Sequence, residues 1–234
     1  MLARPGSLPR GDYAYEVKWD GYRAIVSTEA GLEVRSRRGW SMEERLPELA
    51  RLPEGLVLDG EVVAFGEDGR PSFPLLGLRV LHGRTAIPVT LLIFDLLRVE
   101  SADAMCLPYT ERRRLLEELD LHGPAWRTPE AFDDGEALLA VTSAYGLEGI
   151  VAKRRRDPYR PGERGWVKVK HRHYWRFGRD LGFRTGFASS PAGHAHSNGP
   201  RGPTTKRSSA WPTRLPLEAM SQPAPIGART AAMS

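Results

Sequence analysis

One lysine, Lys18, lies between two carboxylates in the segment EVKWDGYR, residues 16–23. Glu16 and Asp20 stand two positions before and after it, and residues two apart on a strand share one face. The simplest interpretation is a solvated strand face on which the lysine pairs with these acids. The alternative is a lysine nucleophile, which needs nearby positive charge because two carboxylates favour the unreactive ammonium form.

Other charged residues accompany apolar, strand-like runs further along the chain. The segments LDGE, FDLL, EGIVAK and WVKVK contain Glu61, Phe94, Glu148, Lys168 and Lys170. Each segment alone is typical of an ordinary strand, and alternating lysines commonly protect a sheet edge. Together they supply the carboxylates for a metal ion and the additional lysines that a reactive Lys18 requires.

The elements that position these residues combine strands and helices. Alternating or β-rich apolar runs predict strands at 13–20, 23–28, 32–37, 56–65, 89–97, 149–153 and 166–170. Helical periodicity predicts helices at 110–119 and 135–145, and capping-box spacing from Ser41 to Glu44 predicts a helix over 41–49. We expect Arg112–Arg114 on the solvated face of the first helix. The loop RRRDPYRPGERG is interpreted as solvated, with DNA phosphates as the alternative contact.

The net charge of the 234-residue chain is +5, and this excess comes from its last segment. Residues 171–234 hold nine Lys or Arg and two Asp or Glu, which leaves residues 1–170 with a net charge of −2. Glycine, proline, serine and arginine dominate beyond about residue 180, a composition typical of disorder. We therefore predict one domain over 8–172 and a basic, disordered tail over 173–234.

Composition also excludes several classes of protein. No apolar run approaches the roughly 18 residues of a membrane span, and the N-terminal segment lacks the apolar core of a signal peptide. The single cysteine, Cys106, rules out an internal disulfide and a cysteine-rich zinc site. These features predict a reduced, cytoplasmic setting without a membrane partner.

Six segments follow one another in a fixed order: EVKWDGYR, SRRG, LDGE, FDLL, EGIVAK and WVKVK. This combination resembles the adenylation domain of ATP-dependent DNA ligases, most of all the ligase domain of bacterial end-joining ligases. The resemblance implies an α+β, ATP-grasp-like fold in which antiparallel sheets are flanked by helices. It also implies ATP and Mg²⁺ (or Mn²⁺) as cofactors and nicked double-stranded DNA as the substrate.

The resemblance also assigns roles to single residues. Lys18 is the nucleophile that forms a lysine–AMP intermediate for sealing DNA nicks in repair and recombination, and Glu61 and Glu148 are expected as ligands of the metal ion. The nucleotide-binding set is Glu16, Arg23, Arg37, Glu61, Phe94, Lys168 and Lys170. In that set the arginines are expected on the ribose or phosphates of AMP, the phenylalanine on adenine and the two lysines on the α-phosphate.

Complete ligases of this kind continue into an OB-fold domain, whose alternating strands we do not find after Lys170. The simplest interpretation is a truncated or frameshifted ligase that charges its lysine slowly and seals nicks poorly on its own. We expect a monomer in the bacterial cytosol or nucleoid, with end-joining repair proteins as partners. Two alternatives stay open, a non-catalytic nucleic-acid-binding remnant of a ligase and a nucleotidyltransferase of the RNA-ligase type.

Overall fold

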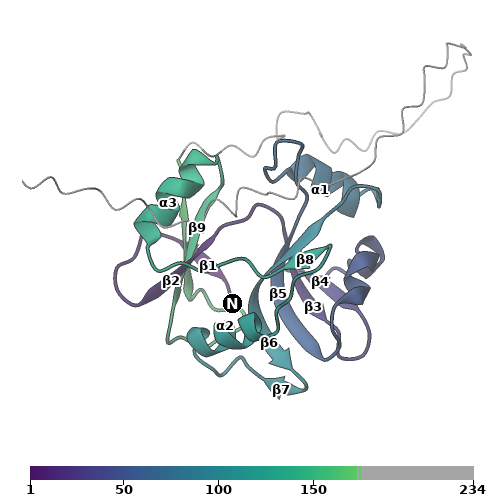
Figure 1. Ribbon diagram of the computed structural model, residues 1–234, viewed down its shortest axis with the longest axis horizontal. Helices are drawn as coiled ribbons and strands as arrows, with labels where there is room; N and C mark the ends of the chain where they lie inside the picture. Colours follow the sequence, from purple (N-terminus) through teal and green to yellow (C-terminus); the bar gives the residue numbers. More distant parts are fainter. Residues whose placement is uncertain (173, 175–234) are drawn as a thin grey trace, which may run out of the picture. The chain divides into compact units, whose positions relative to one another are not determined.

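The computed structural model describes residues 1–172 and 174, which form two sheets flanked by short helices (Figure 1). One sheet has the strand order β1-β10-β9-β2. The other has the order β4-β3-β5-β6-β7, and β8 pairs with β6. Most neighbouring strands are antiparallel, so the predicted α+β fold class is confirmed. Apart from residue 174, the predicted tail over 173–234 lies outside the described residues.

The first sheet contains the segments with the candidate lysines. Its strands are β1 (Ala3–Pro5), β2 (Tyr13–Val17), β9 (Gly149–Arg154) and β10 (Trp166–Lys170). β9 pairs antiparallel with both β2 and β10, and β1 adds a parallel edge strand to β10. β1 was not predicted, because three residues with a proline show no alternating apolar pattern.

The second sheet contains the main hydrophobic core. Its strands are β3 (Tyr22–Ser27), β4 (Glu33–Ser36), β5 (Leu56–Val63), β6 (Thr90–Val99), β7 (Ala102–Asp103) and β8 (Trp126–Arg127). β3 and β4 pair antiparallel and correspond to the strands predicted at 23–28 and 32–37. β5 and β6 correspond to those predicted at 56–65 and 89–97. Fully buried side chains of this core include Val26, Leu58, Ile93 and Leu96. Burial of this apolar surface supplies the main driving force for folding.

Three α-helices of the described segment pack on the sheets. They are α1 (Phe73–Val80), α2 (Tyr109–Glu118) and α3 (Gly135–Ala144). α2 contacts β6, and α3 contacts β2 and β9, as Figure 1 shows. α2 and α3 match the predicted helices, whereas α1 was missed because its eight residues, FPLLGLRV, include a proline and a glycine.

The predicted helix over 41–49 is wrong. Two short 3₁₀-helices, Glu43–Arg45 and Pro47–Arg51, replace it. Proline at residue 47 has no backbone N–H and disfavours the helical conformation of Leu46, which separates the two turns. The Ser41 hydroxyl donates to the Glu43 side chain instead of capping a backbone N–H group.

The expectation that Arg112–Arg114 lie on a solvated face holds only for Arg114. The Arg112 side chain is 1% exposed and binds Asp95 through Nε–Oδ1 and Nη2–Oδ2 contacts of 2.7 and 3.1 Å. Arg113 is also buried and donates to the backbone oxygen of Pro129. Helical periodicity separates charged from apolar positions, but it does not reveal a buried carboxylate on a neighbouring strand.

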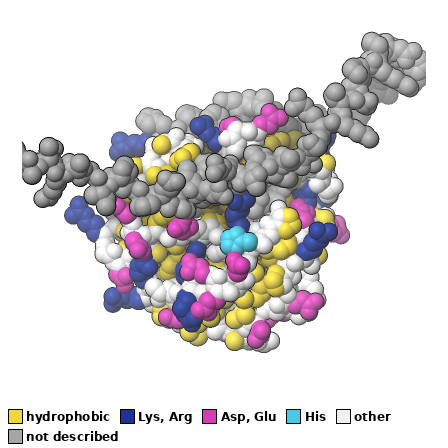
Figure 2. Space-filling model, viewed as in Figure 1, with side chains coloured by type: hydrophobic (Ala, Val, Ile, Leu, Met, Phe, Trp, Pro, Cys, Tyr) yellow, Lys and Arg dark blue, Asp and Glu magenta, His cyan; other side chains and the backbone are white. Residues whose placement is uncertain are grey.

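The described surface shows no single-sign patch on the face seen in Figure 2, where acidic and basic side chains are interspersed. This agrees with the net charge of −2 calculated for residues 1–170. Within the described part of the chain, every helix is too short or too polar to cross a membrane.

Candidate active site

A pocket of about 800 Å³ lies between the two sheets and draws its lining from both. Ligand pockets typically measure roughly 300–1,000 Å³, so this one can hold a small molecule. It contains every residue that the sequence predicted for the site: Glu16, Lys18, Arg23, Arg37, Glu61, Phe94, Glu148, Lys168 and Lys170. Cationic side chains outnumber anionic ones in the lining, which suits an anionic ligand.

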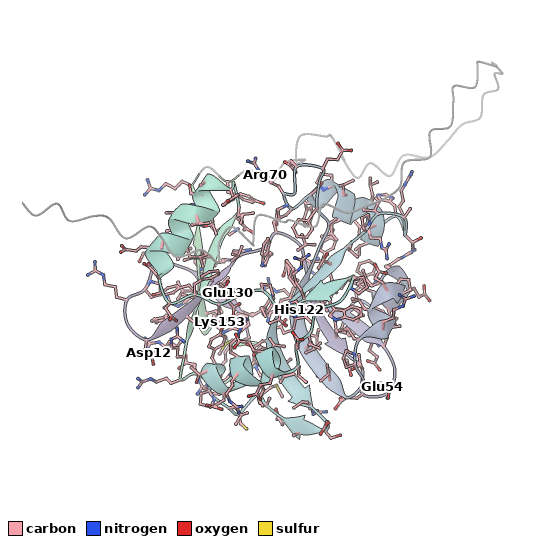
Figure 3. The ribbon with its side chains drawn as sticks, in the orientation of Figure 1. Asp12, Glu54, Arg70, His122, Glu130 and Lys153 are labelled. Carbon is pink, nitrogen blue, oxygen red and sulfur yellow. The ribbon has the colours of Figure 1, made fainter. Side chains whose placement is uncertain are left out.

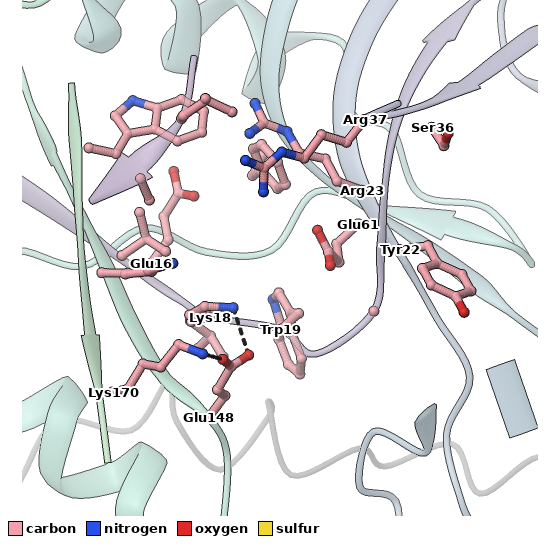
Figure 4. Close-up of a pocket in the computed structure, with 18 of the residues that line it drawn as sticks. Glu16, Lys18, Trp19, Tyr22, Arg23, Ser36, Arg37, Glu61, Glu148 and Lys170 are labelled. Carbon is pink, nitrogen blue, oxygen red and sulfur yellow. Dashed lines mark hydrogen bonds and ion pairs between the residues drawn. The ribbon is translucent and has the colours of Figure 1, made fainter. Parts of the chain in front are cut away.

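Lys18 lies one residue beyond the end of β2, and its amino group points toward β9 and β10. The Lys18 Nζ forms an ion pair of 2.6 Å with Oε2 of Glu148, and Lys170 pairs with the other oxygen of that carboxylate (Figure 4). The predicted strand 13–20 therefore ends earlier, at Val17. The simplest interpretation, in which Lys18 pairs with its sequence neighbours Glu16 and Asp20, does not hold, because the Lys18 ammonium pairs with the distant carboxylate of Glu148.

Glu148 is buried while it holds two lysines. Burial by itself would raise the pKa of this carboxyl, but the charges and hydrogen bonds of Lys18 and Lys170 lower the pKa on balance. Lys168 lies two positions before Lys170 on the same strand, β10. Burial lowers the pKa of Lys168, and the charges of Lys170 and Lys18 lower it further. Three neighbouring ammonium groups repel one another, so an incoming phosphate would relieve an existing repulsion.

Arg23 and Glu61 face this cluster from the second sheet (Figure 4). The Arg23 guanidinium binds buried Asp59 in a bidentate manner, with Nε–Oδ1 and Nη2–Oδ2 distances of 2.9 and 2.5 Å. Arg37 follows β4 and reaches the pocket from an exposed position. Each sheet therefore supplies one side of the site. Because the strands of the two sheets come from different parts of the chain, the site residues are far apart in the sequence.

The Glu61 side chain has no hydrogen bond or ion pair to any described residue, although it is half-buried. Burial raises the pKa of this carboxyl to about 7, and the charges of Lys18 and Arg23 oppose the increase only partly. A carboxylate without a direct partner in a pocket is a suitable ligand for a cation.

The pocket fits a metal ion that arrives with a nucleotide better than a resident metal centre. No group of three metal-binding side chains occurs within residues 1–172. Mg²⁺ commonly takes one or two carboxylates and completes its shell with waters and substrate phosphates. Glu61 and Glu148 both line the pocket and could provide those carboxylates, once Glu148 has released a lysine.

The raised pKa of Glu61 gives a testable pH dependence. A carboxyl whose folded-state pKa is about 7 holds an extra proton between pH 4.5 and 7, so folding stability falls as the pH rises through this range. Glu61→Gln removes this carboxyl, so it should raise the free energy of unfolding more at pH 8 than at pH 5. We expect the gain at pH 8 to exceed the gain at pH 5 by on the order of 1 kcal/mol. Urea unfolding of both proteins at the two pH values measures this. An equal difference at pH 5 and pH 8 would contradict it.

The sequence interpretation missed Lys153, which lies inside the fold (Figure 3). Its side chain is 1% exposed, and its Nζ lies 2.8 Å from Oε2 of Glu16 and donates to the backbone oxygen of Phe94. The same Nζ lies 4.5 Å from the ring centroid of Trp166 and 4.7 Å from that of Phe94. The available signal was its spacing, because residues two apart on a strand share one face. Lys153 therefore shares a face with Val151, and both line the pocket.

Glu16 is likewise buried rather than solvated. Its second oxygen accepts a hydrogen bond of 2.6 Å from the hydroxyl of Tyr109, at the start of α2. Burial and the nearby Glu16 charge raise the pKa of Tyr109 well above its ordinary value, so the hydroxyl stays protonated as a donor. Lys153 thus connects Glu16 and Phe94 on one wall of the pocket, because its Nζ contacts both residues.

Phe94 is half-buried and packs edge-on against Trp166, with ring centroids 5.8 Å apart. The Arg23 guanidinium lies 5.7 Å from the Phe94 ring and 5.2 Å from that of Trp166. Trp166 is a pocket residue that sequence reasoning did not single out. An aromatic wall of this kind offers contacts to a flat base, and the stacking of Phe94 on adenine stays a prediction.

Two motif glycines permit the close strand contacts behind the site. A Cβ atom at Gly21 would collide with the backbone oxygen of Val62 on β5. Gly149 has a φ of 141°, and a Cβ atom there would collide with the backbone oxygen of Val169 on β10. These glycines let Lys18 and Glu148 approach the neighbouring strands.

The pocket lining also includes exposed hydrophobic side chains. Among the described residues, the exposed large hydrophobic side chains are Trp40 and Leu81, and both line this pocket.

In the loop between β9 and β10, Arg155 and Arg156 pair with acidic side chains that include Asp12. This pairing favours the solvated interpretation of their loop over contact with phosphates.

Comparison with known proteins supplies independent information. The model of the ATP dependent DNA ligase domain family matches residues 6–170. The multifunctional non-homologous end joining DNA repair protein LigD of Mycobacterium tuberculosis is 38% identical over 183 residues, which cover 73% of this chain and 24% of LigD. The SPbeta prophage-derived DNA ligase-like protein LigB of Bacillus subtilis is 31% identical over 169 residues, or 70% of this chain and 63% of LigB.

Solved structures agree with these matches. The ligase domain of M. tuberculosis LigD has a TM-score of 0.63 and 36% identity, over 73% of this chain and 59% of that chain. A mycobacterial DNA ligase D complexed with ATP and MES has a TM-score of 0.62 and 35% identity over the same shares. The chain therefore spans about a quarter of the length of full LigD proteins.

Proposed function

Because this chain belongs to the ATP-dependent DNA ligase domain family, we propose that it transfers AMP from ATP to Lys18 as the first step of sealing nicked double-stranded DNA. The observation that carries the proposal is the cluster of Lys18, Lys168 and Lys170 in a pocket with an aromatic wall. A nucleotide offers both the phosphates and the flat base that such a pocket recognises. The similar mycobacterial ligase solved with ATP supports the choice of nucleotide.

The proposed reaction is an in-line attack on phosphorus. The Lys18 Nζ bonds to the α-phosphorus of ATP while the bond to the bridging oxygen of the β-phosphate breaks and pyrophosphate leaves. Only the neutral amine can attack, so Lys18 must leave its ion pair with Glu148 and lose a proton. Catalysis of such a transfer depends mainly on positioning and charge neutralisation.

The other pocket residues have roles that follow from their charge. Lys168 and Lys170 would hold the α-phosphate, and Arg23 and Arg37 would contact the ribose or phosphates. Mg²⁺, when bound, would neutralise phosphate charge, with Glu61 and Glu148 as its protein ligands. The AMP would then pass to a DNA 5′-phosphate before a 3′-hydroxyl displaces it.

Intact-protein mass spectrometry after incubation with ATP and Mg²⁺ tests the first step. We expect the mass to rise by one AMP, and peptide mapping to locate the adduct on Lys18. Incubation with GTP serves as the matched control, and it should give less product. A wild-type chain that never gains mass would contradict the proposal and favour a non-catalytic, nucleic-acid-binding remnant.

The DNA substrate and the end-joining partners are part of the same proposal. LigD is named as a non-homologous end joining protein, but the chain covers only 24% of it. Sealing assays on matched nicked DNA and nicked RNA duplexes separate DNA ligation from the RNA-ligase alternative. A preference for RNA would overturn the DNA assignment. The monomeric state and the place in the bacterial cytosol or nucleoid stay predictions.

A further inference from the structure

Tyr159 lies in the loop between β9 and β10, which sequence analysis interpreted as a polar connection. Its hydroxyl donates to Oδ2 of Asp59 at 2.8 Å and accepts a hydrogen bond of 3.2 Å from Nη2 of Arg23. Since Nη2 also donates to Oδ2 of Asp59, the three side chains close a triangle of hydrogen bonds. A loop residue is thus joined to the arginine that lines the pocket.

The triangle is largely buried, and Arg23 is its member that lines the pocket. Asp59 is completely buried and Tyr159 is 5% exposed, whereas 18% of the Arg23 side chain stays exposed. Burial, and next the charge of Asp59, raise the pKa of Tyr159, so its hydroxyl remains a donor at physiological pH. The Tyr159 hydroxyl therefore supplies a hydrogen bond that water cannot easily replace.

Tyr159 is itself held firmly. Its backbone N–H donates to the oxygen of Met105 at 2.8 Å, and its ring packs edge-on against Trp166 with centroids 5.8 Å apart. The Arg112 guanidinium lies over the Tyr159 ring, 5.8 Å from its centroid. The tyrosine is a fixed point against which Asp59 and Arg23 can be oriented.

The orientation of Arg23 determines which nitrogen faces a ligand. Nε and Nη2 are occupied by Asp59 and Tyr159, and no described residue accepts a hydrogen bond from Nη1. A guanidinium is planar, so fixing two nitrogens also fixes the direction of the third. Arg23 lines the pocket, and Nη1 is the donor left for a ligand.

We propose that Tyr159 is a positioning residue for nucleotide binding, because its hydroxyl locks Asp59 and Arg23 in the orientation that presents Nη1 to the nucleotide. This inference rests on the proposed function, since it takes an adenine nucleotide as the ligand of the pocket. It adds to that function a residue outside the six motif segments, with no predicted contact of its own to the nucleotide.

Isothermal titration of the purified chain with AMP tests the inference. We expect Tyr159→Phe to weaken AMP binding by about 3–10-fold, which is the effect of losing one typical hydrogen bond. Tyr15→Phe is the matched control, because the Tyr15 hydroxyl also donates one internal hydrogen bond. Its acceptor, the oxygen of Pro9, belongs to a residue outside the pocket lining, whereas Tyr159 binds Arg23, which lines the pocket. AMP affinity should be unchanged in this control.

A double variant separates positioning from a general structural effect. Arg23→Lys keeps a positive charge beside Asp59 but lacks the planar fork, so adding Tyr159→Phe to it should cost no further affinity. Equal AMP affinity of Tyr159→Phe and wild type, or full additivity with Arg23→Lys, would overturn the inference. Absence of AMP binding by wild type would also overturn it. AMP binding without a lysine adduct would contradict the proposed function alone.

Discussion

Lys18→Ala is expected to abolish the covalent gain of AMP, because the variant removes the amine that we propose attacks the α-phosphorus. Lys18→Arg should be equally inactive, since a guanidinium stays protonated at neutral pH although it preserves the charge beside Glu148. Intact-mass measurement after incubation with ATP and Mg²⁺ gives the result directly. Wild type should gain one AMP under the same conditions.

Arg114→Ala provides the control for this experiment. Its guanidinium pairs only with Glu111 and Glu118 among the described residues, on the exposed face of α2. Adenylation should continue at the wild-type rate in this variant. An adduct that persists in Lys18→Ala, for example on Lys168 or Lys170, would assign the nucleophile to another lysine of the cluster.

Lys153→Met is expected to cause the largest loss of stability among the pocket variants. Methionine keeps much of the side-chain volume but leaves the buried carboxylate of Glu16 without its cation. Removing one partner of a buried ion pair typically costs about 3–5 kcal/mol, because the other charge stays buried. Urea denaturation followed by circular dichroism measures the free energy of unfolding.

Arg98→Met is the matched comparison for Lys153→Met. Arg98 pairs with Glu29 at 3.2 Å, but 42% of its side chain is exposed, so we expect a loss below about 1 kcal/mol. Adding Glu16→Gln to Lys153→Met should recover part of the lost stability by removing the unpaired charge. A Lys153→Met variant as stable as Arg98→Met would show that the buried pair makes little net contribution.

Sequence reasoning located the pocket because its residues sit on predictable strands. Apolar patterning alone predicts the strands that contain Glu61, Phe94, Lys168 and Lys170. Their order along the chain then supplied the resemblance to a ligase domain. Local periodicity was sufficient for this step, since each motif lies within or directly beside one strand.

Contacts between distant segments could not be predicted in the same way. Strand alternation alone would place Glu16 on a solvated face, yet it is buried because Tyr109 and Lys153 reach it from α2 and β9. Arg112 was expected in solvent, yet it meets Asp95. A charged residue on an amphipathic segment is buried when another segment supplies its counter-charge, and that information depends on the tertiary fold.

Glu148 forms ion pairs with both Lys18 and Lys170. An anionic ligand that binds these lysines must therefore replace the Glu148 carboxylate. This carboxylate pairs with the two lysines that a bound phosphate is expected to contact. A weakly charged solute must displace the Glu148 carboxylate from the lysines. This carboxylate is part of the same chain, so its effective concentration at the lysines is high. A polyphosphate compensates for that displacement with several charges at once. Under the proposed function, such a site would select ligands first by their charge and then by their base. Lys18, the proposed nucleophile, would stay ion-paired with Glu148 until a suitable anion arrives.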